Sequence, residues 1–249
     1  MIEAVTTLIS GGQGFFLGAV GQKGLLNKYS DWPHVVMIDD GCYTDSHLDY
    51  LEKIGSTVKI VPPIRTQRTR FAATRWPRTF TNLNLWSLTE YEHVLFLDSD
   101  AYPYQQIDGL FRIWEPDFLA ATTFGPRNPN RFRSGMMVVK PDQDRYSQLL
   151  EYVKRDPVQI QAKLGDQGVL NCFVNDNLDG KFDKVCYHWH TVTWPRRPKN
   201  VVIGHVRPKP WAGRPEKLKG YKTSIQPFID RWKEAKKEIE EQYGEAPVL

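Results

Sequence analysis

The sequence predicts a doubly wound α/β fold, and three observations point to it. Short apolar runs alternate with segments of helical character through the first hundred residues, an order typical of a parallel sheet flanked by helices. The run His93–Leu97 is continuous and apolar, as expected for a central strand buried on both faces. The 249 residues, 41% hydrophobic and 25% charged, suffice for a full core and exclude a disordered or collagenous chain.

The first half of the chain contains four predicted strands and three predicted helices. A glycine-rich turn, Ser10–Gly14, follows the first strand, and Thr44 is suited to cap a helix that ends near Gly55. Ligands of doubly wound sheets bind beyond the carboxyl ends of the strands, so this turn and Asp98-Ser99-Asp100 are expected to border a site. The other elements are strands Ala4–Ile9, His34–Ile38, Thr57–Val61 and His93–Leu97, and helices Phe15–Leu26 and Phe80–Leu88.

The second half is less regular, and the sequence shows neither a linker nor an internal repeat, which favours a single domain. A final amphipathic helix is predicted over 224–243, with Phe228, Trp232 and Ile239 on one side. The remaining predicted elements are strands Phe118–Thr123, Met136–Lys140 and Val201–Gly204, and helices Gln143–Lys154 and Asp166–Val174.

The net charge of +4 is modest, but the charges are unevenly placed. Seven basic residues and no acidic one lie between Glu52 and Glu90, and seven more lie between Asp183 and Glu216. Basic stretches on either side of a carboxylate pair suit a phosphate ligand held with a divalent metal. Nucleic-acid binding and solvated basic loops are the alternatives at this point.

Apolar runs are too short to span a bilayer, and the first residues do not form a secretory signal. The three cysteines (Cys42, Cys172 and Cys186) are odd in number and not spaced for zinc, which suits a reducing compartment. We therefore expect a soluble, cytoplasmic protein.

Asp98 and Asp100 are separated by one residue on the turn that leaves the His93–Leu97 strand. Two carboxylates at this spacing can reach one cation, and Mg²⁺ or Mn²⁺ would keep positions open for phosphate oxygens. A solvated acidic turn is the alternative.

Four blocks resemble glycosyltransferase family 8 in order and approximate spacing. The segment from Trp86 to Asp100, followed by Ile107–Phe111, is similar to the family's metal-binding motif. The others are Arg133–Pro141, similar to the family's Asn-Ser-Gly strand; Gly165–Asn171, similar to its Gly-Asp-Gln-Gly helix start; and His205–Trp211, similar to its C-terminal His and Lys-Pro-Trp segment.

This resemblance implies a single GT-A domain over 1–249, with a Rossmann-like nucleotide-sugar-binding half (1–111), an acceptor-side half (112–223) and a C-terminal helix (224–243). It also implies a UDP-sugar donor, Mn²⁺ or Mg²⁺, and sugar transfer with retained configuration to a glycan, polyol or glycoprotein acceptor. Nucleic acid is then not an expected partner. Metal ligands would be Asp98, Asp100 and His205, and Lys209 would contact the diphosphate.

The resemblance further implies donor contacts from both halves of the chain. Thr7, Leu8 and Phe15 would border the base and ribose, and Asp166 and Gln167 would act at the transferred sugar as the catalytic pair. The other residues implied in donor binding are Arg78, Asn82, Ser99, Ser134 and Gly135. The residues identify no nucleophile, which favours same-face attack over a covalent intermediate.

Three positions depart from the family's pattern. Asn82 stands where the family usually has Lys or Arg, and Arg78 or Arg75 would replace that cation. Arg133 stands where the family has Asn, and Lys163 where glycogenins have a carboxylate. Because both changes fall on the acceptor side as the resemblance has it, we expect an acidic, phosphorylated or unusual acceptor.

Several other interpretations stay open at this stage. The glycine turn lacks the full dinucleotide-binding pattern, although Asp39 and Asp40 follow at about the right distance. His188 and His190 share one face of a strand but lack an obvious third zinc ligand, and Trp189, Trp194 and Trp211 suit either core packing or sugar stacking. Another metal-dependent nucleotide enzyme, or a weakly catalytic nucleotide-sugar- or glycan-binding relative, are the rival functions.

Overall fold

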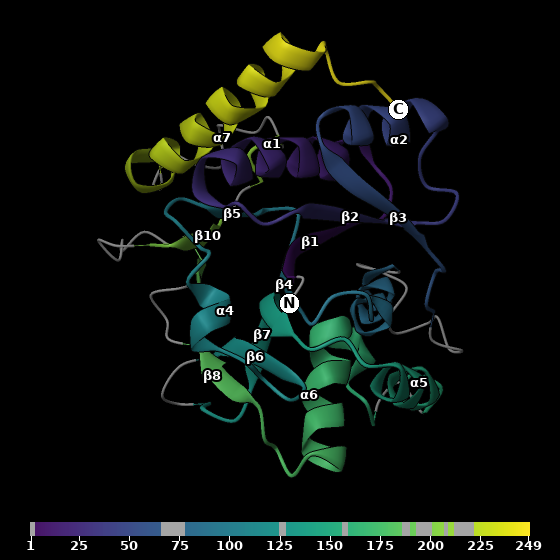
Figure 1. Cartoon of the computed structure of the whole chain (residues 1–249). Helices are drawn as coiled ribbons and strands as arrows, with labels where there is room; N and C mark the ends of the chain where they lie inside the picture. The colour runs from purple at the N-terminus through teal and green to yellow at the C-terminus, as the bar shows by residue number, and fades with distance from the viewer. Residues whose placement is uncertain are drawn as a thin grey trace.

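The computed structural model describes residues 3–65, 78–124, 128–155, 159–185, 190–192, 201–206, 209–211 and 222–249. The chain forms a twisted sheet with helices on both faces (Figure 1). Within the described ranges, no helix combines the length and apolar character needed to cross a bilayer.

The central sheet has seven strands in the order β3-β2-β1-β4-β7-β6-β8. Four of its pairings are parallel, and β7 runs antiparallel to both β4 and β6. The sheet is therefore mostly parallel, as the alternation of strands and helices predicts. Its strands are β1 (Glu3–Ile9), β2 (His34–Asp39), β3 (Ser56–Val61), β4 (His93–Leu97), β6 (Leu119–Thr123), β7 (Phe132–Val139) and β8 (Asp183–Val185).

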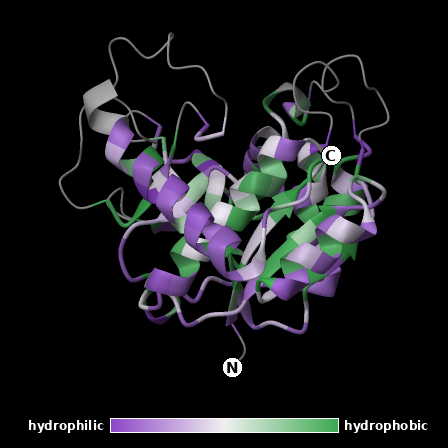
Figure 2. Ribbon diagram, turned by 90° about the horizontal axis from the view of Figure 1, so that it is seen from above, coloured by the Kyte–Doolittle hydropathy of each residue, from purple (hydrophilic) through white to green (hydrophobic). Residues whose placement is uncertain are grey.

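Strand β4 is buried on both faces, because its alternate side chains enter two different cores. Val94 and Phe96 pack in one hydrophobic cluster, whereas Leu95 and Leu97 pack in another. The first core lies under the 3-10 helix η1 (Thr79–Ser87) and the helices α5 (Gln143–Tyr152) and α6 (Asp166–Asn177). Hydrophobic residues gather along the strands and polar ones on the outer helices (Figure 2). This double burial explains the continuous apolar sequence of the strand.

The opposite face of the sheet is covered by α1 (Gln13–Tyr29) and α2 (Asp45–Lys53), with α7 (Lys222–Tyr243) packed outside α1 (Figure 1). Trp232 and Ile239 of α7 are 4% and 3% exposed, which confirms the apolar side predicted for this helix. Close approach of the two helices depends on small residues: a Cβ at Gly24 would lie 2.5 Å from the carbonyl oxygen of Ala235.

A second sheet of three short strands is absent from the sequence-based expectations except for its middle strand. It consists of β5 (Ala101–Pro103), β10 (Ile203–His205) and β9 (His190–Val192), with β10 between the other two. The register pairs His205 with Ala101. This small sheet therefore carries a residue from the C-terminal part of the chain to the turn after β4.

The predicted elements are present with small shifts of their ends. One helix differs in kind, because the segment predicted to be helical over Phe80–Leu88 forms the 3-10 helix η1. The strand predicted over Met136–Lys140 begins earlier, at Phe132, and the helix predicted from Phe15 begins at Gln13. Short elements not predicted are α4 (Leu110–Ile113) and η2 (Ala162–Leu164), together with β5, β8 and β9.

Candidate active site

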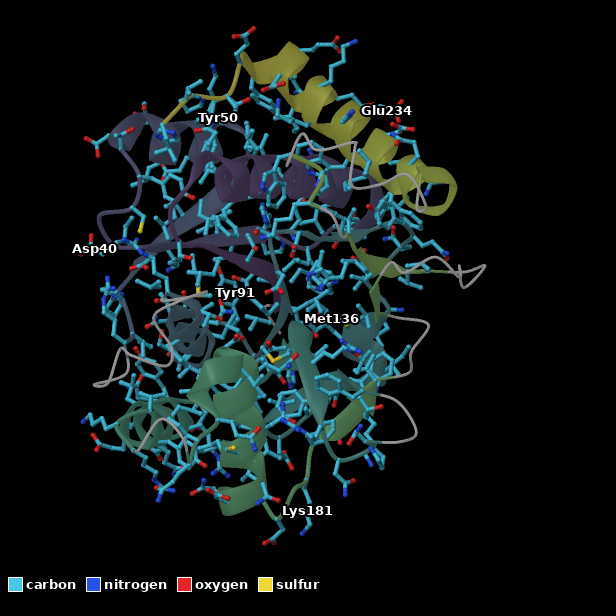
Figure 3. All side chains as sticks on the ribbon, turned by 180° about the vertical axis from the view of Figure 1, so that it is seen from behind. Asp40, Tyr50, Tyr91, Met136, Lys181 and Glu234 are labelled. Carbon is cyan, nitrogen blue, oxygen red and sulfur yellow. The ribbon has the colours of Figure 1, made fainter. Side chains whose placement is uncertain are left out.

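The turn Asp98–Asp100 lies at the carboxyl end of β4, where the backbone N–H of Asp98 donates to the carbonyl of Gly135 in β7. Directly after β10, the N–H of Val206 donates to the carbonyl of Asp100 at 2.8 Å. Two backbone contacts thus bring three distant segments of the chain together. Met136, which follows Gly135, lies near the middle of the molecule in Figure 3.

Asp98, Asp100 and His205 form a compact group of potential metal ligands. One ligand atom from each side chain lies within 4.8 Å of the others. The Nε2 atom of His205 is 2.8 Å from Oδ1 of Asp100 and 3.7 Å from Oδ2 of Asp98. Carboxylate oxygen and imidazole nitrogen are suitable donors for Mn²⁺, so the residues present fit a divalent cation.

Gly135 provides the space in which these side chains meet. A Cβ at this position would lie 2.8 Å from both Cε1 and Nδ1 of His205 and 2.9 Å from Oδ2 of Asp98. These distances are shorter than ordinary contacts, so any larger residue would displace the ligand group. A glycine at this position therefore leaves room for the side chains of Asp98 and His205 to approach each other.

The cluster carries an excess of negative charge. The surrounding protein raises the pKa of Asp98 to about 6 by desolvation, and the charges of Asp100 and Asp166 act in the same direction, while His205 opposes them. About a third of the Asp98 side chain, 34%, is open to solvent, whereas those of Asp100 and His205 are 6% and 5% exposed. A cation bound here would offset the repulsion between carboxylates and would be reachable from outside.

Lys209 extends the cluster toward the first helix. Its Nζ lies 3.6 Å from Oδ2 of Asp100 and 4.2 Å from the centre of the Phe15 ring. The Phe15 ring in turn lies 6.2 Å from that of Trp211. The structure therefore brings together the aromatic residue at the start of α1, the lysine and the carboxylates.

Trp211 reaches the site because α1 is built with small residues. A Cβ at Gly14 or Gly18 would overlap the indole ring, and at Gly18 it would also lie 2.5 Å from the carbonyl oxygen of Ser99. Trp211 thus packs on the helix and beside the turn. Of the two functions open for this residue, the described contacts show packing.

Asp166 opens α6 after Gly165, whose φ of +70° few other residues adopt. Its carboxylate accepts hydrogen bonds from Thr79 Oγ1 at 2.5 Å and from Asn82 Nδ2 at 3.2 Å. Both donors lie on η1, so the helix start is held by neutral groups. Asp166 is 6% exposed, and its charge contributes to the raised pKa of Asp98.

The remaining predicted residues line the nearby strand ends and turns. Thr7 and Leu8 lie near the carboxyl end of β1, and the buried Thr7 hydroxyl has no hydrogen-bond partner among the described residues. Arg78 lies at the start of η1, 3.5 Å from Oδ2 of the buried Asp39 and in contact with Cys42. It therefore lies beside the glycine turn, because a Cβ at Gly11 would be 3.7 Å from its Nη1.

A series of buried, hydrogen-bonded polar side chains contacts the turn after β4, and the sequence did not reveal it. Gln22 Nε2 donates to the carbonyls of Asp98, at 3.2 Å, and Ala101, at 2.7 Å. Its Oε1 lies 3.2 Å from His34 Nε2, and His34 Nδ1 lies 2.9 Å from Ser56 Oγ. The only sign of it in the sequence is a glutamine within the apolar segment Phe15–Leu26, which is predicted to be helical.

Two further predicted residues, Ser134 and Gln167, lie in β7 and α6. Ser134 is 7% exposed and adjoins Gly135, whereas Gln167 is partly exposed and its carbonyl accepts from Asn171 Nδ2. Arg75, His188, Trp189 and Trp194 lie outside the described residues, as do the side chains of Lys163 and His190.

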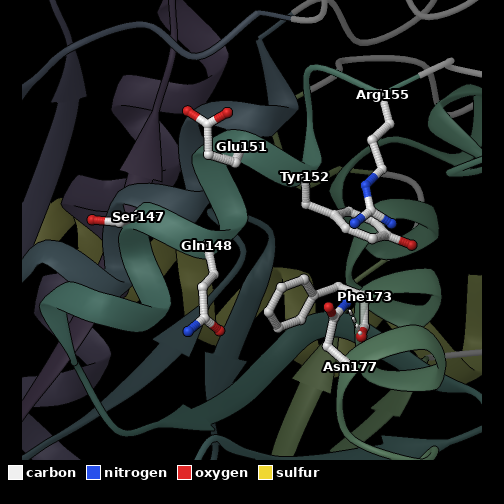
Figure 4. A pocket seen from close by; sticks show the side chains of 7 residues that line it. All are labelled: Ser147, Gln148, Glu151, Tyr152, Arg155, Phe173 and Asn177. Atoms are coloured by element: carbon white, nitrogen blue, oxygen red, sulfur yellow. Dashed lines mark hydrogen bonds between the residues drawn. The ribbon is translucent and has the colours of Figure 1, made fainter.

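A separate pocket of about 530 Å³ lies between α5 and α6 (Figure 4). Its aromatic residues, Tyr152 and Phe173, are 2% and 1% exposed, so their ring faces are not available for stacking on a ligand. Asp98, Asp100 and His205 do not line it.

Comparison with solved structures identifies the fold. The galactosyltransferase LgtC, crystallised with donor and acceptor sugar analogues, superposes with a TM-score of 0.58 over 95% of this chain and 96% of LgtC, at 14% identity. A likeness of this kind shows the fold, which is that of the GT-A glycosyltransferases.

Sequence comparison identifies the family. The sequence model of glycosyl transferase family 8 matches residues 23–205, and the chain belongs to that family. Galactinol synthase 2 of Arabidopsis thaliana is 25% identical over 92% of this chain and 79% of the relative. UDP-glucuronate:xylan alpha-glucuronosyltransferase 1 of the same plant is 27% identical over 90% of this chain but only 29% of the relative.

Proposed function

We propose that this protein is a metal-dependent, retaining glycosyltransferase that moves a hexose or related sugar from a UDP-sugar to a glycan, polyol or protein-linked acceptor. The observation that carries the proposal is the group formed by Asp98, Asp100 and His205, with Lys209 beside it, at the carboxyl end of the central strand. Membership of a glycosyltransferase family supports the reaction class. A relative named for UDP-glucuronate supports a UDP-sugar as donor.

In this proposal Asp98, Asp100 and His205 hold Mn²⁺ or Mg²⁺. The cation, when bound, acts as a Lewis acid that offsets the charge developing on the diphosphate leaving group. Lys209 supplies a second positive charge to the same diphosphate, because its ammonium group already lies 3.6 Å from Asp100. Ser99 and Gly135 keep the turn and the ligand group closely packed.

The nucleotide is proposed to lie along the ends of β1 and α1. Thr7 and Leu8 would border the base and ribose, and the unpaired buried hydroxyl of Thr7 is suited to a ligand hydrogen bond. Phe15 would pack on the nucleotide beside Lys209. Arg78, which is held by Asp39, provides positive charge that Asn82 lacks.

The transferred sugar is proposed to lie between the metal group and α6. Asp166 would bind donor hydroxyls, Gln167 would lie near the anomeric carbon, and Ser134 would border the sugar from β7. The bond from the anomeric carbon to the phosphate oxygen breaks, and the bond to the acceptor oxygen forms on the same face. The leaving phosphate takes the acceptor proton, so no protein nucleophile is needed.

We further propose that residues 1–111 provide the nucleotide-sugar half of one GT-A domain, residues 112–223 the acceptor side and residues 224–243 the closing helix. The packing of α7 against α1 supports this division, because the helix stabilises the first half instead of forming a separate unit.

The proposal is tested by incubating the protein with a panel of UDP- and GDP-sugars, with Mn²⁺ or with a chelator, and measuring released nucleoside diphosphate. We expect metal-dependent release from one UDP-sugar, and its loss in Asp98→Asn and Asp100→Asn. Metal-independent release, or release that survives both substitutions, would contradict the assignment.

A second candidate function is a weakly catalytic nucleotide-sugar-binding relative. It is favoured by one observation: Asp166 is held by the neutral groups of Thr79 and Asn82, where the family's pattern has a cation. Metal-dependent binding of UDP together with no release from any donor, even with acceptors added, would select this alternative.

A further inference from the structure

We propose that Arg131 and Arg133 form a site for an anionic group, a carboxylate or phosphate, carried by a substrate of this glycosyltransferase. The inference rests on the proposed function, since it concerns the substrate that meets the metal group. It adds a charge requirement to a reaction whose acceptor and sugar are otherwise unspecified.

Arg133 lies close to the proposed metal group along β7. Arg133 precedes Gly135 by two residues in β7, and a strand rises by about 3.3 Å per residue, so its backbone lies within about 7 Å of the glycine that borders His205 and Asp98. The pairing of β6 with β7 shifts register between Ala121 and Thr123, beside this segment. Such irregularities often occur next to active sites, where they redirect a side chain.

Both guanidinium groups lie against the same aromatic ring. The Cζ atoms of Arg133 and Arg131 lie 4.5 Å and 6.0 Å from the centre of the Phe124 ring, which is 37% exposed. Arg131 Nη2 also donates to Gln161 Oε1 at 2.8 Å. A ring face and an amide oxygen orient a guanidinium, so these contacts preorganise the two arginine side chains.

The segment is also fixed relative to the proposed sugar-binding residues. Asn171 of α6 accepts from the N–H of Phe132 and donates to its carbonyl, both at 2.9 Å. The same Nδ2 donates to the carbonyl of Gln167 at 2.7 Å. Asn171 therefore ties the residue between the two arginines to the first turn of the helix that carries Asp166 and Gln167.

Charge composition points the same way. From Phe118 to Pro141 the sequence has four basic residues and no acidic one. Sugar hydroxyls do not require full positive charges, whereas the planar guanidinium matches a carboxylate or phosphate in two-point hydrogen bonding. An anionic group on the substrate would therefore pair with this local excess of cations.

Two sources of the anionic group are separated by calorimetric titration in the presence of Mg²⁺. In the donor arm, UDP-glucuronate is compared with UDP-glucose. In the acceptor arm, the protein is first saturated with UDP, and glucose 6-phosphate and glucuronate are each compared with glucose. Wild type is compared with Arg133→Gln, Arg133→Lys and Arg131→Gln.

The matched control is Arg155→Gln, since Arg155 stacks on Tyr152 at a similar distance, 4.4 Å, but lines the separate pocket between α5 and α6. We expect the charged member of at least one pair to bind at least tenfold more tightly to wild type. That preference should fall to less than threefold in Arg133→Gln and stay unchanged in Arg155→Gln.

Equal binding of charged and neutral members in both arms, or a preference that survives in all the Arg131 and Arg133 variants, would overturn the inference. If Arg133→Gln does not fold, Arg131→Gln decides the question. Absence of metal-dependent UDP binding to wild type would instead count against the proposed function itself, so the two failures are distinguishable.

Discussion

Replacing Gly135 by alanine tests whether the glycine exists for the metal group. The added methyl would lie 2.8 Å from two atoms of the His205 ring and 2.9 Å from Asp98 Oδ2, whereas such contacts settle near about 3.5 Å. His205 and Asp98 must then each move by roughly 0.6–0.7 Å away from the added methyl. Disturbing the surroundings of metal ligands typically costs 10–100-fold in affinity, or about 1.4–2.7 kcal/mol.

The assay is a titration of Mn²⁺ into wild type and Gly135→Ala, followed by the electron paramagnetic resonance signal of the free ion. Gly109→Ala is the matched control, because a Cβ at Gly109 meets nothing within 4 Å and its φ is −70°. We expect a 10–100-fold weaker metal affinity in Gly135→Ala alone, with a folded far-UV spectrum. Unchanged affinity in the folded variant would refute the assignment of these side chains as metal ligands.

Three further predictions concern stability and the support of the site. Gln22→Ala removes two hydrogen bonds to the turn after β4, so we expect a loss of about 1–3 kcal/mol in urea unfolding and weaker Mn²⁺ binding; full retention of both would show that the buried polar side chains do not position the turn. Gly24→Ala gains about 1 kcal/mol of helix propensity, but its methyl would lie 2.5 Å from the Ala235 carbonyl, and overpacking costs about 1–3 kcal/mol. We expect a lower melting temperature, and a higher one would mean that α1 and α7 separate without cost. Burial lowers the pKa of His34 from 6.5 to about 3, so the unfolded chain takes up a proton first and stability falls as the pH drops below 6.5. Between pH 7 and pH 5 the loss from this residue is about 2 kcal/mol, and His34→Gln should show a flatter dependence in urea unfolding at the two pH values.

The sequence predicts most of the central sheet because the burial of a strand is visible in its own pattern of apolar residues. The run His93–Leu97 is apolar throughout since both faces of β4 are buried, and its predicted limits agree with the structure. Helix α7 is predicted equally well, because one side packs and the other is solvated. In both cases the pattern of one segment is enough.

Long-range pairings are harder to predict from the residues. The three-residue strands β5, β9 and β10 have no internal periodicity. They exist because β10 pairs with β9, 13 residues earlier, and with β5, about one hundred residues earlier. The position of His205 beside Asp100 follows from that pairing, so the sequence identifies it only through the resemblance to a family. Likewise, the stacking of Arg133 on Phe124 and the support given by Gln22 depend on the tertiary fold.

The most direct test of the metal group is the affinity of UDP for the protein with Mn²⁺ and with a chelator, measured by calorimetry for wild type and His205→Ala. Asp98, Asp100 and His205 are proposed to hold the cation that receives the diphosphate. We therefore expect UDP to bind wild type at least a hundredfold more tightly with Mn²⁺, and most of that difference to be absent in His205→Ala. Equal UDP affinity with and without the metal would contradict the central claim.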